Sequence, residues 1–417
     1  MIQIIRGFKD ILPGETELWQ HIEICARSLF ENFGFKEIRI PILEKTELFA
    51  RSIGEDTDIV EKEMYTFEDR KGEKITLRPE ATASIVRSLI QHGLYTKNPV
   101  QKLYTIGPMF RRERPQKGRY RQFYQINAEI FGVGSALADA ELIFILMTLF
   151  SRLSVKNTEA HINSLGCREC RPIYKEALNT HLDDFSSMLC PDCVRRKSRN
   201  PLRVLDCKVP SCRLAMENAP AMVDFLCDDC NAHFEETKQA LEMLKIPFIL
   251  DRNLVRGLDY YTRTTFEIQT SVLGAQNAVA GGGRYDGLVQ ALGGPQISAT
   301  GFAIGFDRLI EVSDLDRDSF VKSPHLFIAA LGEKSRMKAF EWSCRLGEKG
   351  IRTEMELGKK GLKSQMKQAD RLNAGFVIIM GEDELSSGSV VLKDMKTSIQ
   401  EQIPITDVVD AVMRRCI

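Results

Sequence analysis

The segment from 111 to 121, RRERPQKGRYR, concentrates basic side chains in a short stretch of the chain. Six basic residues and one acidic residue give it a net charge of +5. Five of the six are arginines, whose planar guanidinium groups bind phosphate oxygens in pairs. The strand predicted to follow carries Gln125 and Glu129 on one face, because side chains alternate along a strand. A basic loop beside an amide and a carboxylate suits a site that holds a polyphosphate together with a small polar molecule.

Three later segments carry residue types that fit the same chemistry. LVRGLDYYTR (254–263) places an arginine and a tyrosine pair between apolar runs, and GFAIGFDRL (301–309) places Arg308 just inside a predicted helix. AGGGRYDGL (280–288) has consecutive glycines, which let a backbone approach a ligand closely. Each feature has a simpler interpretation, since a tyrosine pair can serve packing alone and a glycine run can be a tight turn.

Familiar nucleotide and hydrolase motifs are absent from the sequence. There is no GxxxxGK[ST], no HExxH and no GxSxG, and GGGRYDG has Asp286 where a dinucleotide-binding loop needs its last glycine. A nucleotide bound by this chain would therefore be held without the usual helix N-terminus.

Eight of the eleven cysteines fall in one region, as CREC, CPDC, CKVPSC and CDDC. The C-x₂-C spacing lets two thiolates hold one Zn²⁺ ion. We expect one or two structural Cys₄ zinc sites in this region, and the spacing leaves the pairing open. Plain packing of the cysteines and a redox role are the alternatives. The candidate ligands are Cys167, Cys170, Cys190, Cys193, Cys207, Cys212, Cys227 and Cys230.

Composition limits the class of protein. The chain has 417 residues, of which 43% are hydrophobic and 27% charged, with 57 basic and 57 acidic side chains. This is enough apolar material for a large core, and it excludes both global disorder and a generally basic, DNA-coating protein. No signal peptide or membrane span is apparent, so we predict a cytoplasmic protein with no membrane partner.

The elements that must position these residues follow from periodicity. Apolar residues at helical spacing predict helices over 15–33 and 137–152, and alternating runs predict a hairpin around 64–80 and two strands flanking the arginine loop. Strands and helices alternate after 325 and are followed by a hairpin and a final helix, which favours a small α/β domain with a mostly parallel sheet.

The predicted fold class is an α+β catalytic domain with a mostly antiparallel sheet, a helical, cysteine-rich insertion and a C-terminal α/β domain. The predicted boundaries are 1–160 with 241–315 for the catalytic domain, 161–240 for the insertion, 313–324 for a linker and 325–417 for the last domain.

The order of these motifs resembles the bacterial histidyl-tRNA synthetases, a family of class II aminoacyl-tRNA synthetases. The resemblance covers nearly the whole chain and rests on RPEAT (78–82), MFRRERPQKGRYRQFYQ (109–125), LVRGLDYY (254–261), GGGRYDGL (281–288) and GFAIGFDRL (301–309). It implies a ligase that activates L-histidine with ATP and transfers the histidyl group to the 3′ end of tRNA(His). IRIP (38–41) looks like the first class II motif, which implies a homodimer.

The resemblance also implies residue roles. Arg256 would be the catalytic arginine, together with Arg111 on the α-phosphate and the amino-acid carboxylate, and Mg²⁺ would share the β- and γ-phosphates. The implied ATP site comprises Arg111, Glu113, Arg119 and Arg308. The implied histidine site comprises Glu80, Thr82, Gln125, Glu129, Tyr260, Tyr261 and Tyr285.

The same resemblance implies two contacts with tRNA. The tip of the arginine loop would meet the acceptor stem through Arg114 and Gln116, and the C-terminal domain would bind the anticodon.

Three alternatives remain at this point. The first is a synthetase-like regulatory subunit of histidine biosynthesis, without catalysis. The second is a zinc-dependent RNA-binding protein, and the third is a class II synthetase for another amino acid.

Overall fold

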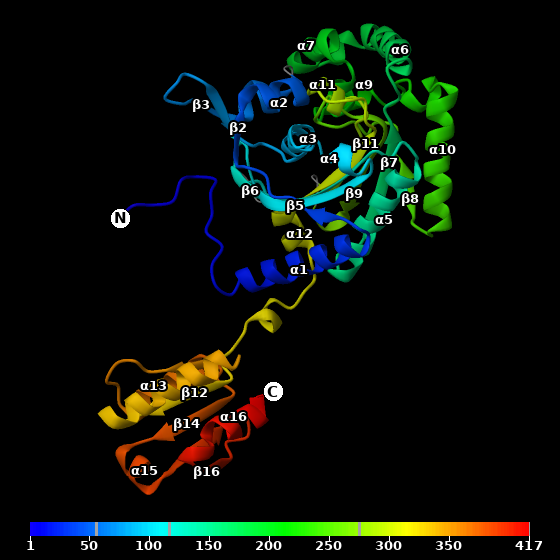
Figure 1. The fold of residues 1–417 in the computed structure, drawn as a ribbon. Helices are drawn as coiled ribbons and strands as arrows, with labels where there is room; N and C mark the ends of the chain where they lie inside the picture. The colour runs from blue at the N-terminus through cyan, green and yellow to red at the C-terminus, as the bar shows by residue number, and fades with distance from the viewer. Residues whose placement is uncertain (55–56, 116–117, 274–276, 417) are drawn as a thin grey trace. The chain divides into compact units, whose positions relative to one another are not determined.

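The computed structural model describes residues 1–54, 57–115, 118–273 and 277–416 (Figure 1). The chain forms two compact units, Met1–Arg317 and Asp318–Ile417, each described here by itself. Across the described residues, every helix is too short or too polar to cross a membrane.

An eight-stranded sheet forms the centre of the first unit. Its strand order is β1-β5-β6-β11-β10-β9-β7-β8, and only the outer pairs β1–β5 and β7–β8 are parallel. The predicted mostly antiparallel sheet is therefore confirmed. The strands are β1 (Lys36–Glu37), β5 (Gln101–Phe110), β6 (Gln122–Phe131), β7 (Thr158–Ser164), β8 (Phe248–Leu250), β9 (Thr262–Thr270), β10 (Ala278–Arg284) and β11 (Ala299–Gly305).

The arginine segment connects the two ten-residue strands β5 and β6. These strands pair antiparallel from Gln101↔Phe131 to Phe110↔Gln122, so the connecting residues emerge at one end of the sheet. The adjacent strand β11 pairs with β6 along its whole length. This register fixes Gln125 and Glu129 on the same face of β6, two residues on either side of Asn127.

Helices cover both faces of the large sheet (Figure 1). The apolar α5 packs on β7, β9, β10 and β11 and on α1 and α10, whereas α2, α3 and α11 pack together on the other side. The helices here are α1 (Thr16–Asn32), α2 (Thr46–Ile53), α3 (Thr82–Gln91), α4 (Leu94–Lys97), α5 (Leu137–Arg152), α11 (Leu288–Ala291) and α12 (Phe306–Val312).

A small second sheet lies beside α2 and has the order β2-β4-β3. The predicted hairpin is confirmed as β3 (Tyr65–Glu68) and β4 (Lys74–Leu77), and β2 is Leu43–Lys45. Pro41 separates β1 from β2, as expected for a residue without an amide donor.

The cysteine-rich segment leaves the sheet after β7 and returns at β8, which pairs with β7. Between them it is helical, with α6 (Cys170–Asp184), α7 (Pro191–Arg199), α8 (Leu202–Leu205), α9 (Pro210–Ala215) and α10 (Asp228–Met243). Five of the twelve residues in its buried core cluster are cysteines, so ordinary apolar side chains supply only a small core.

The second unit is an α/β domain with a five-stranded sheet of order β13-β12-β14-β15-β16. The sheet is mixed, because β12 pairs parallel with β13 and β14, whereas β15 pairs antiparallel with β14 and β16. The α/β class and the hairpin before the last helix are confirmed. The sheet is only half parallel, because the chain returns through α15 to an antiparallel strand instead of making another parallel crossover. The elements are β12 (Leu326–Ala330), α13 (Glu333–Glu348), β13 (Thr353–Met355), α14 (Leu362–Arg371), β14 (Phe376–Met380), α15 (Glu382–Ser387), β15 (Ser389–Asp394), β16 (Gln400–Pro404) and α16 (Val408–Cys416).

Candidate active site

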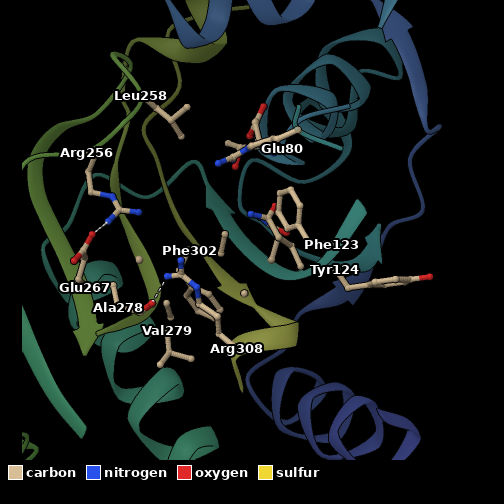
Figure 2. Close-up of a pocket in the computed structure, with 18 of the residues that line it drawn as sticks. Glu80, Phe123, Tyr124, Arg256, Leu258, Glu267, Ala278, Val279, Phe302 and Arg308 are labelled. Carbon is tan, nitrogen blue, oxygen red and sulfur yellow. Dashed lines mark hydrogen bonds and ion pairs between the residues drawn. The ribbon is translucent and has the colours of Figure 1, made fainter. Parts of the chain in front are cut away.

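A cavity of about 280 Å³ opens over β6, β11, β10 and β9 of the large sheet (Figure 2). It gathers side chains from segments that are up to 228 positions apart in the sequence, from residue 80 to residue 308. Ten of the predicted site residues line it: Glu80, Thr82, Arg111, Glu113, Arg119, Gln125, Arg256, Tyr260, Tyr261 and Arg308.

The arginine hairpin supplies two guanidinium groups to this cavity. Arg111 donates through Nε to the backbone oxygen of Pro79 at 2.9 Å, and its guanidinium lies 5.3 Å from the ring centroid of Phe123. Arg119 is paired with Glu113, with 3.0 Å between Nη1 and Oε2. These contacts fix both arginines in place while leaving further N–H groups for an anion.

Arg256 and Arg308 supply two more positive charges, and both are anchored at the β9–β10 side (Figure 2). Arg256 forms an ion pair with Glu267 of β9, and Arg308 Nη1 donates to the backbone oxygen of Ala278 at 2.7 Å. Gly281 of β10 makes room for Arg256, because a Cβ there would lie 2.4 Å from its Nη2. Both arginines thus converge on a region suited to several negative charges.

The start of α3 and the middle of β6 supply acceptors. The buried Glu80 carboxylate accepts from the backbone amides of Thr82 and Ala83, at 2.7 and 2.9 Å. Gln125 Oε1 and Asn127 Oδ1 are buried and find no partner among the described residues. Because an unpaired buried acceptor is costly, this corner is suited to a ligand that brings donors, such as an ammonium group.

Glu129 and Tyr285 lie behind the cavity lining. The Glu129 carboxylate accepts from the Thr82 hydroxyl at 2.7 Å and from the Tyr285 hydroxyl, and its side chain is almost fully buried. A Cβ on Gly301 would lie 1.6 Å from Glu129 Oε2, so the carboxylate occupies the space of the missing side chain. Because Gly301 lines the cavity, the carboxylate lies directly behind this part of the lining.

Burial raises the pKa of Glu129 to about 8, despite hydrogen bonds from Tyr285 and Thr82 that lower it. Burial also raises the pKa of Glu80, which its amide donors partly offset. Three tyrosine rings enclose this corner: the ring centroids of Tyr260 and Tyr261 are 4.7 Å apart, and those of Tyr260 and Tyr285 are 5.5 Å apart. The site thus combines a proton-retaining carboxyl group with aromatic walls.

We expect Glu129→Gln to stabilise the ligand-free protein increasingly as the pH rises. Between the unfolded pKa of about 4.5 and the folded pKa of about 8, the folded chain keeps a proton that the unfolded chain loses. Stability therefore falls with pH across this window, by up to about 1.4 kcal/mol per pH unit, and the amide removes that loss. Denaturant-induced unfolding at pH 5 and pH 8.5 measures the free energy of unfolding of each variant. Glu68→Gln, which changes an exposed carboxylate of the same unit, is the control. An equal effect of Glu129→Gln at both pH values would contradict the raised pKa.

The two residues predicted to contact tRNA are not among those that line the cavity. Arg114 is exposed in the loop between β5 and β6, and the prediction for Gln116 falls outside the described residues. Sequence reasoning missed Glu267 and Asn127. Each lies on the same face of its strand as residues that point toward the cavity. Asn127 lies midway between Gln125 and Glu129, and this spacing could have identified it.

The eight clustered cysteines separate into two groups. Their sulfur atoms lie within 4.8 Å of one another in each group, and none forms a disulfide. One group is Cys167, Cys170, Cys227 and Cys230, and the other is Cys190, Cys193, Cys207 and Cys212.

Comparisons with known proteins agree with this arrangement. A family model described as histidyl-tRNA synthetase matches residues 7–168 and 196–309, and one described as anticodon binding domain matches 325–415. The unmatched stretch 169–195 holds three of the clustered cysteines.

Similar proteins cover nearly the whole chain. The histidine–tRNA ligase of Desulfatibacillum aliphaticivorans is 60% identical over 99% of this chain and 98% of its own length. That of Desulfosudis oleivorans is 60% identical, with the same coverage. The crystal structure of apo Staphylococcus aureus histidyl-tRNA synthetase is similar with a TM-score of 0.83 and 37% identity, covering 99% of this chain and 100% of that one.

Proposed function

The chain belongs to the histidyl-tRNA synthetase family, and we propose that its cavity joins L-histidine to ATP before the histidyl group passes to tRNA(His). The protein charges tRNA(His) with histidine and uses ATP to do so. The observation that carries the assignment of the site is the convergence of Arg111, Arg119, Arg256 and Arg308 on one cavity whose far corner holds carboxylate, amide and tyrosine groups.

The first half-reaction needs orientation and charge neutralisation more than acid–base catalysis. The histidine carboxylate attacks the α-phosphorus of ATP, and pyrophosphate leaves. The nucleophile is already an anion, so no general base is required, and positioned cations stabilise the developing charge. The cavity is accordingly rich in arginine, and none of the described residues that line it is a histidine.

We assign the α-phosphate to Arg111 and Arg256, which line the cavity from the β5–β6 connection and from the 254–261 loop. Arg111 also holds the histidine carboxylate in a bidentate manner. Arg119 and Arg308 hold the β- and γ-phosphates. Burial and the nearby Arg119 lower the pKa of Arg308, so the charged guanidinium gains from a phosphate group bound beside it.

Mg²⁺ would share the charge at the polyphosphate end. Glu113 and Glu267 both line the cavity and both act electrostatically on Arg308. Carboxylate oxygens together with phosphate oxygens are the ligands that Mg²⁺ prefers, so these residues fit the ion. Bound there, it would neutralise the leaving pyrophosphate.

The opposite corner binds histidine. Glu80, Thr82 and Gln125 receive its ammonium group, which supplies the donor that the buried Gln125 Oε1 lacks. Glu129, which lies behind the lining at Gly301, and Tyr261 read the two imidazole nitrogens, one as donor and one as acceptor. Tyr260 and Tyr285 form the aromatic wall around the ring.

In the second half-reaction the terminal ribose of tRNA attacks the adenylate. We propose that the loop bearing the exposed Arg114, with Gln116, contacts the acceptor stem, and that the unit from Asp318 onward binds the anticodon. A homodimer, a cytoplasmic location, structural zinc and the domain boundaries given by the sequence stay predictions.

Histidine-dependent exchange of pyrophosphate into ATP, measured with a panel of amino acids, tests this function. We expect exchange with histidine alone. Exchange with another amino acid would favour a synthetase of different specificity, and no exchange would favour the regulatory subunit, which the close similarity to histidine–tRNA ligases disfavours.

We expect Gly281→Ala to slow adenylate formation about tenfold, since a small misplacement of a catalytic group is enough to lower the rate. The added methyl would meet the Arg256 guanidinium at 2.4 Å and push it from its place. Single-turnover rates of adenylate formation measure the effect. Gly347→Ala is the matched control, because a Cβ there meets nothing within 4 Å. Equal rates for both variants would show that Arg256 need not lie over Gly281.

A further inference from the structure

We propose that the cysteine-rich insertion is a two-zinc module that holds the substrate loop 254–261 in place. Its Cys₄ sites are nested in the sequence, with the first and last cysteine pairs in one site and the two middle pairs in the other. One site joins CREC to CDDC, through Cys167, Cys170, Cys227 and Cys230. The other joins CPDC to CKVPSC, through Cys190, Cys193, Cys207 and Cys212. The link to the loop rests on the proposed function, whereas the metal sites do not.

The sulfur geometry fits tetrahedral zinc. With Zn–S bonds of about 2.3 Å, the sulfur atoms of a tetrahedral site lie about 3.8 Å apart. The Cys167 and Cys170 sulfurs are 3.5 Å apart, those of Cys167 and Cys227 are 3.9 Å apart, and those of Cys190 and Cys207 are 3.9 Å apart. These separations far exceed a disulfide bond of about 2.05 Å.

Backbone donors surround the sulfur atoms as they do in metal–thiolate sites. The amide of Cys227 lies 3.2 Å from Cys170 Sγ in the first site. The amide of Cys190 lies 3.1 Å from Cys212 Sγ in the second. In both sites a helix begins at a ligand pair, α10 after Cys227 and α7 after Cys190, and its positive end favours thiolates.

The insertion needs such links because its core is small. Cysteines make up a large share of its buried cluster, and the remaining apolar residues come from short helices. A segment with so little apolar core usually folds around metal or disulfides. The two zinc ions would supply the stability that the small apolar core does not.

Three hydrogen bonds connect this module to the substrate loop. Arg171, next to Cys170, donates to the backbone oxygen of Tyr261 and, at 3.2 Å, to that of Leu165. Arg203 of α8, between the ligand pairs of the second site, donates to the backbone oxygen of Arg256 at 3.0 Å. Asn200 donates to the Asp259 carboxylate at 2.9 Å. Each cysteine group is therefore linked by a hydrogen bond to the backbone of a residue that lines the cavity.

Metal analysis of cysteine variants tests the pairing. We expect about two zinc ions per chain in protein purified under reducing conditions. Cys167→Ser with Cys227→Ser removes ligands from one site and should leave about one ion, whereas Cys167→Ser with Cys190→Ser should leave none. If CREC paired with CPDC and CKVPSC with CDDC, the first double variant would keep no ion and the second would keep about one. Cys344→Ser, an exposed cysteine of the second unit, is the control and should keep both ions.

The wild-type chain provides a second measurement if the variants do not fold. Titration of its thiols with a mercurial, in the presence of a zinc-sensitive dye, should release one ion for about every four thiols modified. Fewer than two ions per chain, or disulfides among the eight cysteines in the reduced protein, would overturn the two-site proposal.

The coupling to the loop has its own readout. On removal of zinc, amide hydrogen exchange over 254–263 should accelerate and the KM for histidine should rise more than that for ATP. Unchanged exchange in this segment would overturn the coupling while leaving the metal sites standing. Because zinc content and hydrogen exchange do not depend on activity, their failure is distinguishable from a failure of the proposed reaction.

Discussion

Arg256→Ala should lower the rate of adenylate formation about 10²–10³-fold while changing the KM for histidine and for ATP little. The guanidinium is held by Glu267 and positioned over Gly281, so its orientation is fixed before substrate binds. A preformed cation of this kind acts mainly where charge develops on the α-phosphate, and therefore in the transition state. Single-turnover and pyrophosphate-exchange rates measure the loss.

Two further variants sharpen this test. Arg256→Lys keeps the charge but loses the planar fork, so its rate should lie between those of the wild type and the alanine variant. Arg252→Ala removes an exposed arginine four residues away and should leave the rate unchanged. A rise in both KM values at unchanged kcat would place Arg256 in ground-state binding and contradict its catalytic role.

Glu129→Ala should lower kcat/KM for histidine by about 10³-fold or more and leave ATP binding nearly intact. The change removes the acceptor of the Thr82 and Tyr285 hydroxyls, and with it the carboxyl group that we propose as the hydrogen-bond partner of the imidazole ring. An imidazole nitrogen that is buried without a hydrogen-bond partner keeps the full cost of its desolvation, so histidine binds less tightly. Calorimetric titration with histidine and, separately, with ATP measures the two affinities.

Tyr285→Phe distinguishes loss of recognition from loss of structure. It removes one hydroxyl donor to Glu129 but keeps the ring that packs against Tyr260. We expect a smaller loss of histidine affinity than in Glu129→Ala, with the fold retained. Unchanged histidine activation in Glu129→Ala would remove this carboxylate from the amino-acid site.

Much of the site could be predicted from local pattern. The arginine segment lies between two alternating runs, and strands β5 and β6 form there with Gln125 and Glu129 on one face. Helices over 137–152 and near 15–33 follow from the spacing of apolar residues, and α5 has the predicted bounds. These features depend on neighbours a few residues apart, so period and turn chemistry are sufficient to predict them.

Other features depend on contacts between residues that are far apart in the sequence. Glu267 is identified as the partner of Arg256 only because β9, β10 and β11 lie side by side in the sheet order. The need for glycine at positions 281 and 301 is visible only in the folded chain, where Arg256 and Glu129 fill the space that a side chain would take. In the second unit, local pattern predicted the hairpin β15–β16 but not that β15 would pair antiparallel with β14, because that pairing depends on how the chain returns through α15.

Residue types and short spacings were enough to identify the family, the set of charged side chains and the number of candidate metal ligands. The three-dimensional fold was needed to show which cysteines lie together, which carboxylate pairs with which arginine, and how Arg171 and Arg203 connect the insertion to the 254–261 loop. Sheet order and helix packing bring these groups together, and both result from the burial of the whole apolar core rather than from any local segment.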